Sequence, residues 1–205
     1  MTKKNYSTIK QCRICGGYDL KSVLSLGELY ISTFVSHPEE NIGKAPLELV
    51  FCPNCKLLQL KDTAPQELMY SGYYWYQSGL NQVIIKDLNE IADIATTMTG
   101  LKTGDIVLDI GANDGTLLSF YRKDLIRVGC EPANNLVQKL KKITPYVIHD
   151  FWNLENWQRL MGNKKAKVIT AIGMFYDMEN PNQFIKDATE VLSEDGLFIA
   201  QLMCL

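Results

Sequence analysis

Two C-x2-C units constrain the first part of this chain more strongly than any other feature. They are Cys12-Arg-Ile-Cys15 and Cys52-Pro-Asn-Cys55, with 36 residues between them. Two residues between cysteines let both thiolates of a tight turn point at one ion, and two such turns complete a tetrahedral shell of four sulfurs. Because cysteine takes all four positions and leaves none for water, we predict a structural zinc ion that does no chemistry.

The alternative interpretation of these cysteines is a pair of disulfides, which would suit a secreted chain. The first residues, MTKKNYSTIKQC, lack the apolar core of a signal peptide. We therefore expect a reduced, cytoplasmic setting, in which paired cysteines usually bind metal. The remaining two cysteines, Cys130 and Cys204, lie in apolar strand-like contexts and are predicted to be small core residues.

The overall charge and hydropathy argue against two classes of partner. The 205 residues carry a formal net charge of −2, with a pI near 5.7. This balance gives no electrostatic reason to expect nucleic acid or an acidic membrane surface, and no apolar run is long enough to span a bilayer. We expect a small-molecule substrate and a chain that is a monomer or a weak homodimer.

The pattern of the chain divides it into three parts. Residues 1–66 alternate as short strands between glycines and prolines, which predicts a small β-rich zinc-binding domain. A domain this small rarely holds together on its apolar core alone. Residues 67–99 are predicted to form an aromatic linker and a connecting helix over 81–98. Two roles for the aromatic run stay open: packing between domains, or bordering a ligand cleft with tyrosine hydroxyls and Ser78.

Apolar strands alternate with helices from residue 100 to 205. Strands are expected at 106–111, 127–132, 146–150, 167–173 and 197–202, and helices near 117–122 and over 134–142 and 180–196. This alternation predicts an α/β fold, a Rossmann-like parallel sheet with helices on both faces. Ligands are expected at the carboxyl ends of the strands, where the strand order reverses.

The turn GANDG after the first of these strands limits what the ligand can be. A dinucleotide site needs G-x-G-x-x-G for its pyrophosphate, but Asn113 stands at the middle glycine and Leu118 at the third. Asp109 and Asp114 flank the turn and disfavour pyrophosphate by their charge. We therefore expect a cationic or zwitterionic ligand without phosphate, such as S-adenosylmethionine.

The next two strand ends carry side chains that suit the same ligand. Glu131 closes the second strand, where a carboxylate can accept both ribose hydroxyls. Asp150 and Phe151 end the third strand, where an acid can bond the adenine amino group and a ring can stack on the base. The predicted cofactor residues of this part of the chain are Asp109, Gly111, Asn113, Gly115, Glu131, Asp150 and Phe151.

The chain resembles the sugar C-methyltransferases that act on nucleotide-linked deoxysugars. The resembling stretches are CRICG, LSLGELYISTF, FCPNCKLLQL, YYWYQSGLN, VLDIGANDGTLL and FYDMENPNQFIKDATEVLSEDGLFIAQL, in the same order over nearly the whole chain. The family joins an N-terminal zinc-binding domain to a class I methyltransferase domain. The resemblance implies methyl transfer from adenosylmethionine to a carbon beside a sugar carbonyl, after a base removes the α-proton. It also implies that Tyr76 lies by the substrate, and Tyr74 and Ser78 near the cofactor.

The chain departs from this family in its catalytic segments. Many relatives have a histidine after the fourth strand, in a pattern like F-x-H-x-x-D-P, and here Asp177 takes its place. The family's Tyr-His-Glu-His segment, which carries the proposed base, is absent. We therefore expect a truncated sheet and an N-terminal fragment whose main base lies beyond Leu205, with Tyr76 and Asp177 as the catalytic candidates within the chain. His149 is a weaker substitute, since a histidine at a strand end is more often structural.

Two other functions stay open at this point. The first is a binding module without catalysis, in which a zinc ribbon recruits a partner and the α/β half senses adenosylmethionine. The second is an NAD-linked enzyme, which the broken glycine pattern disfavours.

Overall fold

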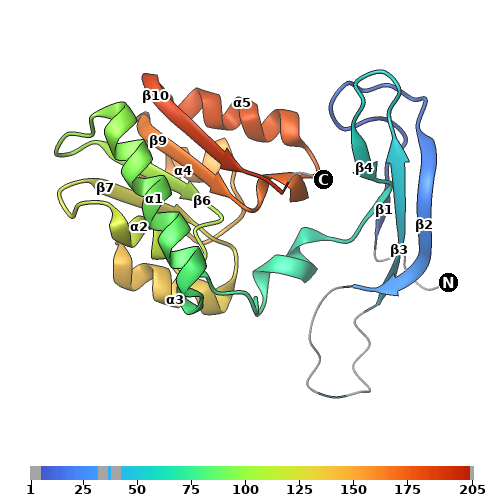
Figure 1. The fold of residues 1–205 in the computed structure, drawn as a ribbon, viewed down its shortest axis with the longest axis horizontal. Coiled ribbons are helices and arrows are strands. Elements are labelled where there is room, and N and C mark those ends of the chain that lie inside the picture. The colour runs from blue at the N-terminus through green and yellow to red at the C-terminus, as the bar shows by residue number, and fades with distance from the viewer. Residues whose placement is uncertain (1–5, 32–36, 38–42, 204–205) are drawn as a thin grey trace. The chain divides into compact units, whose positions relative to one another are not determined.

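The computed structural model describes residues 6–31, 37 and 43–203, and the chain divides into two compact units (Figure 1). The first unit extends to Tyr70 and also contains Glu179–Asn182. The second unit comprises Ser71–Met178 and the residues from Gln183 onward. All three tryptophans of the chain therefore lie in the second unit, which gives that unit a spectroscopic signal of its own.

The first unit is built from short antiparallel strands, as its glycine and proline spacing predicts. Its three-stranded sheet has the order β2-β3-β4, with β2 at Lys21–Tyr30, β3 at Lys44–Phe51 and β4 at Leu58–Leu60. A second pair joins β1 (Ser7–Thr8) to β5 (Asp62–Thr63). The β-rich character predicted for this region is confirmed over the residues that the structure describes.

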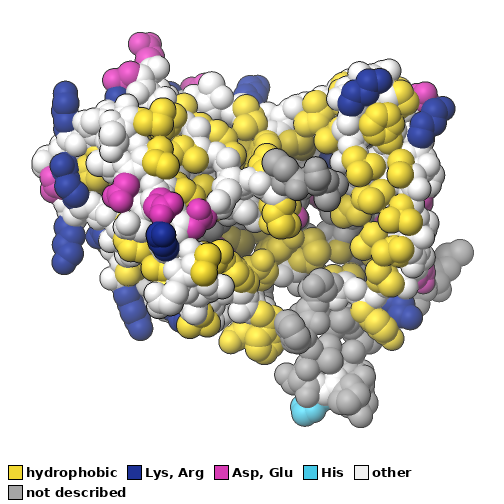
Figure 2. Space-filling view, in the orientation of Figure 1, with side chains coloured by type: hydrophobic (Ala, Val, Ile, Leu, Met, Phe, Trp, Pro, Cys, Tyr) yellow, Lys and Arg dark blue, Asp and Glu magenta, His cyan; other side chains and the backbone are white. Residues whose placement is uncertain are grey.

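The first unit buries few apolar side chains. All ten residues of β2 are exposed, and Figure 2 shows hydrophobic side chains gathered on the surface of this sheet. The described apolar residues of the unit that are buried are Cys12, Ile31, Val50, Cys52 and Ala64. So small a core rarely stabilises a domain of this size, and disulfides or a metal are the usual supplement.

The second unit is a five-stranded parallel sheet with the order β10-β9-β6-β7-β8. The strands are β6 (Ile106–Ile110), β7 (Ile126–Cys130), β8 (Tyr146–Ile148), β9 (Ala166–Ile172) and β10 (Leu192–Gln201). From the central strand β6 the chain runs outward to β7 and β8, then returns to β9 and β10. The strand order therefore reverses between β6 and β9, and the predicted Rossmann-like parallel sheet is confirmed.

Helices cover both faces of this sheet. The helices are α1 (Gln82–Thr99), α2 (Thr116–Phe120), α3 (Asn134–Ile143), α4 (Leu154–Met161) and α5 (Pro181–Val191). Side chains of α1, α2 and α3 form one buried cluster with Val107, while side chains of α4 and α5 form another with Leu108. Because successive strand residues point to opposite faces, Asp109 shares the face of Val107. In the described part of the chain, no helix is long and apolar enough to cross a membrane.

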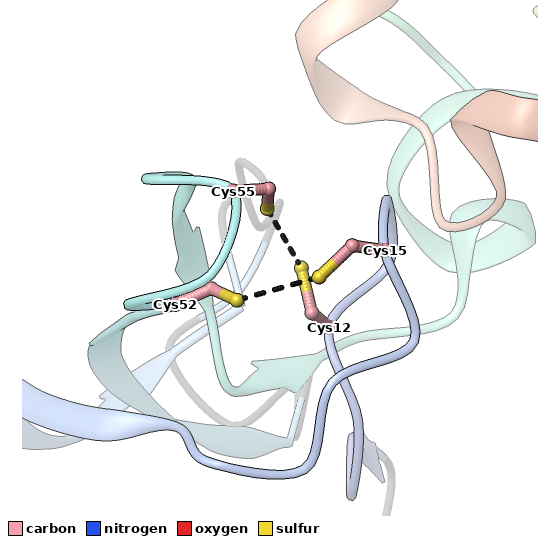
Figure 3. Close-up of side chains that lie close together, drawn as sticks. All are labelled: Cys12, Cys15, Cys52 and Cys55. Carbon is pink, nitrogen blue, oxygen red and sulfur yellow. Dashed lines mark hydrogen bonds between the residues drawn. The ribbon is translucent and has the colours of Figure 1, made fainter.

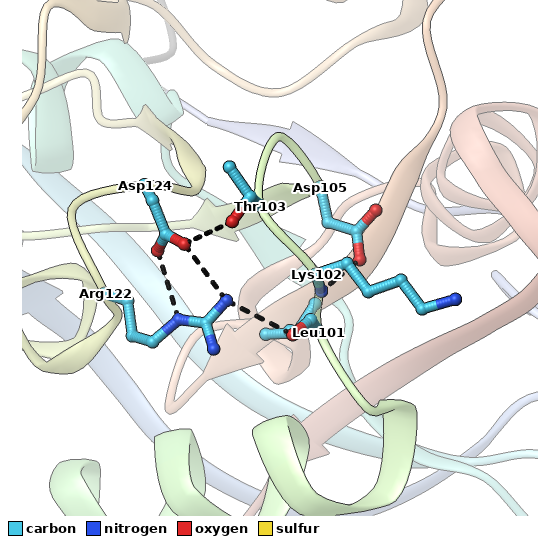
Figure 4. A network of polar contacts seen from close by, with 6 residues as sticks. All are labelled: Leu101, Lys102, Thr103, Asp105, Arg122 and Asp124. Carbon is cyan, nitrogen blue, oxygen red and sulfur yellow. Dashed lines mark hydrogen bonds and ion pairs between the residues drawn. The ribbon is translucent and has the colours of Figure 1, made fainter.

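A polar network fixes the entry to β6 (Figure 4). The Arg122 guanidinium donates to the Asp124 carboxylate and to the carbonyl of Leu101, and the Thr103 hydroxyl donates to the same carboxylate at 2.6 Å. Asp105 accepts the backbone N–H of Lys102 at 2.7 Å. The loop before β6 is thereby joined to the loop before β7, which aligns the starts of two neighbouring strands.

One expectation about the helices was wrong, and one helix was not predicted. The helix expected over 180–196 ends at Val191, because Leu192 already pairs with Ala166 of β9 and the register shifts before Leu197 pairs with Val168. Helix α4 was not predicted, although Asn153 caps it by accepting the N–H of Asn156 at 2.8 Å. Its eight residues give too short an apolar pattern to stand out from the flanking loops.

The prediction for Cys130 is confirmed, because this residue is 1% exposed within the sheet core. Burial raises the pKa of its thiol well above the ordinary value, so the thiol stays protonated and inert. Cys204 lies outside the described residues.

Candidate cofactor cavity and metal centre

The four cysteines predicted to bind metal lie together in the first unit (Figure 3). Their sulfurs all lie within 4.8 Å of one another, and the Cys12–Cys55 and Cys15–Cys52 sulfur pairs are each 3.5 Å apart. Four sulfurs bound tetrahedrally to zinc at about 2.3 Å would be about 3.8 Å apart. The cluster therefore fits a zinc ion with a closed shell of four thiolates.

The two cysteine turns repeat one backbone geometry. Gly16 N–H donates to the carbonyl of Cys12, and Lys56 N–H donates to the carbonyl of Cys52, both at 2.9 Å. Gly16 and Lys56 both adopt positive φ, 70° and 66°. This conformation suits glycine but costs a lysine about 1–2 kcal/mol, so the second turn needs an outside constraint of the kind a shared metal ion provides.

Gln59 supports this cluster from outside the ligand set. Its Nε2 donates to the sulfur of Cys12 at 3.2 Å, and its Oε1 accepts from the backbone N–H of Arg13 at 3.1 Å. Burial opposes ionisation of Cys12, but hydrogen bonds from the backbone of Cys15 and Ile14 and from Gln59 bring the pKa of this thiol below its ordinary value. Such outer hydrogen bonds orient a ligand and stabilise its thiolate. Sequence analysis did not identify Gln59, which reads as an ordinary strand residue.

The second unit contains a cavity of about 430 Å³ at the carboxyl ends of β6 and β9. This is the point where the strand order reverses, and ligands of open α/β sheets bind there. The predicted site residues that line the cavity are Tyr74, Tyr76, Ser78, Asp109, Gly111 and Asn113. The structure thus brings the aromatic run and the glycine turn to one place, although they are more than 30 residues apart in sequence.

Every backbone N–H of the turn from residue 111 to 116 already has a partner within the protein. Gly111 and Ala112 donate to the carbonyl of Cys130, at 2.9 and 3.0 Å. The other donations are Asn113 to Glu131 Oε2, Asp114 to Asn113 Oδ1, Gly115 to the carbonyl of Ala112, and Thr116 to Asp114 Oδ1. A phosphate-binding loop needs these groups for its ligand. The turn therefore offers no cradle for a pyrophosphate.

Asn113 is the residue of this turn that contacts the aromatic segment. It adopts a φ of 53°, which asparagine tolerates better than most side chains. A glycine here, as in a dinucleotide site, would have no side chain to bond with the aromatic segment. The Asn113 side chain accepts from the N–H of Ser78 at 3.0 Å and donates to the carbonyl of Tyr76 at 3.1 Å.

Glu131 is buried and holds the turn from the end of β7. Its two carboxylate oxygens accept the N–H groups of Asn113 and Ala133, both at 2.8 Å. Burial raises the pKa of Glu131, while these two backbone donors oppose the rise. Glu131 does not line the cavity. It stabilises the turn through these two hydrogen bonds, a role that was not predicted, and its contact with a ribose stays a prediction.

The charge of the cavity is acidic. Its lining contains two carboxylates, Asp109 from β6 and Asp87 from α1. Within the described chain, no lysine, arginine or histidine lines it. Asp109 is 4% exposed and accepts the Thr170 hydroxyl at 2.6 Å. Burial raises the pKa of Asp109 to about 7. Gln201, at the end of β10, donates to Asp87 at 2.9 Å. Such a lining attracts a cation.

The aromatic segment that borders the cavity, residues 72–79, is called the strap below. Asn135 and Asn113 hold its backbone through side-chain hydrogen bonds, and Asp114 accepts the N–H of Gly79 at 2.9 Å. The side chains of Tyr74 and Tyr76 line the cavity. Those of Tyr73 and Trp75 do not line it and are 58% and 53% exposed. The predicted role of this run as a cleft border therefore has a structural basis in two tyrosines and Ser78.

Of the two catalytic candidates, Tyr76 is among the cavity-lining residues, and Asp177 follows another of them, Tyr176, in the sequence. Tyr176 lines the cavity, and its neighbour Asp177 ends a short 3-10 turn. Burial raises the pKa of Tyr74, and the charge of Asp177 adds to the rise; the same two causes raise the pKa of Tyr176. Both phenols thus stay protonated near neutral pH and can donate hydrogen bonds. Asp177 itself does not line the cavity.

Several predicted residues lie away from the cavity lining. Gly115, Asp150 and Phe151 do not line it, nor does His149, whose side chain is exposed. Asp150 accepts the N–H of Phe151 at 2.7 Å. The assignment of Asp150 and Phe151 to the adenine remains a prediction.

Four residues of the site were missed by sequence analysis: Asp87, Asn135, Tyr176 and Gln201. Asp87 sits on a polar position of an amphipathic helix, a place usually read as solvent-facing. Asn135 follows Asn134 at a helix start, where asparagine is common for local reasons. Only their tertiary contacts distinguish them. Tyr176 is the one of the four that could have been predicted from sequence, because it precedes the catalytic candidate Asp177.

Two family models match the chain. A model described as “Putative zinc binding domain” matches residues 12–70, and one described as “Methyltransferase domain” matches residues 76–204. The second match covers more than half of the chain. The chain belongs to the methyltransferase family. The first match contains all four clustered cysteines, and the second contains the glycine turn and every cavity-lining residue except Tyr74.

Individual proteins similar to this methyltransferase were also found. “C-methyltransferase NovU” of Streptomyces niveus is 25% identical over 199 residues, which are 95% of this chain and 47% of that protein. The chain thus spans about half the length of this relative. Among solved structures, the plantazolicin methyltransferase BpumL has 17% identity and a TM-score of 0.49, covering 60% of this chain and 49% of that one. Streptomyces venezuelae DesVI has 17% identity and a TM-score of 0.45, covering 58% and 50%.

Proposed function

We propose that the cavity binds S-adenosylmethionine and that the protein transfers a methyl group to a carbon of a nucleotide-linked deoxyketosugar. The observation that carries the cofactor is the acidic cavity at the switch point, beside a turn whose N–H groups are all used internally. Adenosylmethionine carries a sulfonium and an ammonium and has no phosphate, so it matches this site where NAD does not.

The residues present fit such a ligand. Asp87 supplies negative charge, and Asp109 adds to it above about pH 7. The Tyr74 phenol supplies a donor, and Ser78 is a small polar residue of the lining. Glu131 keeps lone pairs beyond those that accept Asn113 and Ala133, since each carboxylate oxygen can accept two hydrogen bonds. When bound, adenosylmethionine supplies an electrophilic methyl group to a nucleophile.

The substrate class rests on the resemblance to sugar C-methyltransferases and on the name of the Streptomyces niveus relative. Methylation of carbon needs a proton removed from the position beside a carbonyl, and hence a base in reach. Tyr76 lines the cavity and is 49% exposed, so it can face a substrate that enters from solvent. Asp177, close enough to raise the pKa of two tyrosines, is the carboxylate candidate for the base.

The catalytic candidates and the neighbouring tyrosines are weak bases for this chemistry. Asp109, whose pKa is about 7, is assigned to the cofactor, because its side chain is 4% exposed and already accepts the Thr170 hydroxyl. Tyr74 and Tyr176 are held protonated, and an ordinary aspartate near pKa 3.9 is a poor base for a carbon acid. Loss of a well-matched base typically lowers the rate by about 10²–10⁴. We therefore expect residues 1–205 to bind the cofactor well and to transfer methyl groups slowly.

The test is methyl transfer from labelled adenosylmethionine to a panel of nucleotide-linked ketosugars. The proposal predicts label in a sugar carbon, at a rate that falls further in Asp177→Asn and Tyr76→Phe. Thr97→Ala, an exposed change on α1, is the matched control. Label that appears on oxygen or nitrogen of the acceptor would contradict the proposed carbon chemistry.

A binding module without catalysis is the second candidate, favoured by the protonated state of Tyr74 and Tyr176. Adenosylhomocysteine binding with no transfer to any sugar of the panel, by a protein that retains its zinc, would support this role over the first.

A further inference from the structure

Residues 73–77 of the strap belong to no helix or strand, and Gln77 has the extended backbone angles φ −133° and ψ 119°. In the described part of the chain, residues 72–77 belong to no sheet, although extended backbone leaves N–H and C=O groups that need partners. The N–H of Tyr74 donates to Asn135 Oδ1 at 2.9 Å, and Asn135 Nδ2 donates to the carbonyl of Tyr74 at 3.0 Å. One side-chain amide thus makes the same two bonds that a neighbouring strand would make.

The pattern repeats two residues farther along the strap. The Asn113 amide donates to the carbonyl of Tyr76 and accepts from the N–H of Ser78, at 3.1 and 3.0 Å. The residues held in this way are the ones that line the cavity, whereas Tyr73 and Trp75 are exposed. Because an extended chain has a period of two, a slip by one residue would exchange the inward and outward sets.

The strap also has hydrogen bonds at its two ends. The N–H of Asn134 donates to the carbonyl of Gly72 at 3.1 Å, and the N–H of Gly79 donates to Asp114 at 2.9 Å. The rings of Tyr73 and Trp75 pack on each other with centroids 4.6 Å apart, but both are more than half exposed. Lys139 donates to Gln77 in an exposed pair, and exposed polar pairs contribute little. The two asparagine amides are thus the side chains that hold the backbone of the cavity-lining residues Tyr74, Tyr76 and Ser78.

We infer that Asn135 is a positioning residue that fixes the register of the strap and thereby which aromatic side chains line the cavity. Its consequence for cofactor binding rests on the proposed function. Asn135 does not line the cavity itself and reaches it only through the backbone of Tyr74. Asn113 shares the task but also shapes the glycine turn, so Asn135 is the residue that separates the two effects.

The test compares Asn135→Ala and Asn135→Asp with the matched control Asn134→Ala. The Asn134 side chain is exposed, and the bond from its backbone N–H to the carbonyl of Gly72 survives the change. Amide hydrogen exchange of residues 72–79 is measured against exchange in β6 and β9. We expect exchange at Tyr74 to rise about tenfold or more in Asn135→Ala, since both its hydrogen bonds are lost.

The aspartate variant keeps an acceptor for the N–H of Tyr74 and loses the donor to its carbonyl, so its exchange should be intermediate. The affinity for adenosylhomocysteine should be roughly three- to tenfold lower in Asn135→Ala than in the parent. In Asn134→Ala this affinity should equal that of the parent. Unchanged exchange in the strap of Asn135→Ala would overturn the inference, as would an equal rise in β6 and β9. If the parent protein binds no adenosylhomocysteine, the proposed function fails, and the exchange data still decide the role of Asn135.

Discussion

Replacing Asp109 by asparagine should make the second unit more stable and the cofactor site weaker. Asp109 is 4% exposed, and burial raises its pKa from 3.8 to about 7. At 1.36 kcal/mol per pKa unit, this rise corresponds to about 4 kcal/mol of free energy. Asparagine keeps an oxygen for the Thr170 hydroxyl and carries no charge to be desolvated.

The direction with pH follows from the two protonation states. Because the folded-state pKa of Asp109 lies above that of the unfolded chain, the folded protein keeps a proton that the unfolded chain has lost between about pH 4 and pH 7. The contribution of Asp109 to stability therefore falls as the pH rises through this window and is constant above it. Asp109→Asn should remove this fall, so its advantage over the parent should be largest at pH 8 and small near pH 4.

The assay is urea unfolding followed by tryptophan fluorescence, which reports on the second unit alone. Asp93→Asn, an exposed change on α1, removes the same charge and is the control. In the same samples, adenosylhomocysteine binding should weaken in Asp109→Asn by about 1.5–3 kcal/mol, the range for a hydrogen bond to a charged group. An Asp109→Asn protein that is less stable than the parent at pH 8, or that keeps the parent's pH dependence, would refute the reasoning.

Three further predictions concern the metal centre and the turn. Cys52→Ser should lose its zinc, measured by elemental analysis, and with it the folded first unit, because metal binding and folding are coupled in so small a domain; a variant that keeps one zinc per chain would contradict the four-sulfur site. Gln59→Leu should keep its zinc but have about 10–100-fold lower metal affinity, measured by competition with a chelator, because Cys12 loses its outer donor; unchanged affinity would remove Gln59 from the account. Glu131→Ala should destabilise the second unit by about 2–4 kcal/mol, because two N–H groups lose their acceptor, and calorimetry should show weaker adenosylhomocysteine binding; unchanged affinity after correction for unfolding would refute its predicted contact with the ribose.

The features predicted well from sequence are those that local spacing determines. Cys12 and Cys15 are brought together by their own turn, and the glycine pattern around Asn113 departs from a dinucleotide site within six residues. The parallel sheet follows from repeated alternation, which needs no knowledge of distant contacts. From these features the fold class, the metal ligands and the sign of the charge in the cavity could be predicted.

The features that were missed depend on contacts between distant segments. Asn135 lies 61 residues from the Tyr74 backbone that it holds, and Gln201 lies 114 residues from Asp87. Glu131 was identified by its place at a strand end, but its contact with the N–H of Asn113 becomes visible only when β6 and β7 are adjacent. An asparagine or aspartate carries no sequence signal that separates such a role from an exposed polar position.

The binding of adenosylhomocysteine is the most direct test of the central claim, that the acidic cavity at the switch point is an adenosylmethionine site. Calorimetric titration of the zinc-loaded chain should show one site per chain, and a parallel titration with NAD should show none, because the turn has no N–H groups left for a pyrophosphate. Tight binding of NAD, or no heat with adenosylhomocysteine, would contradict the account.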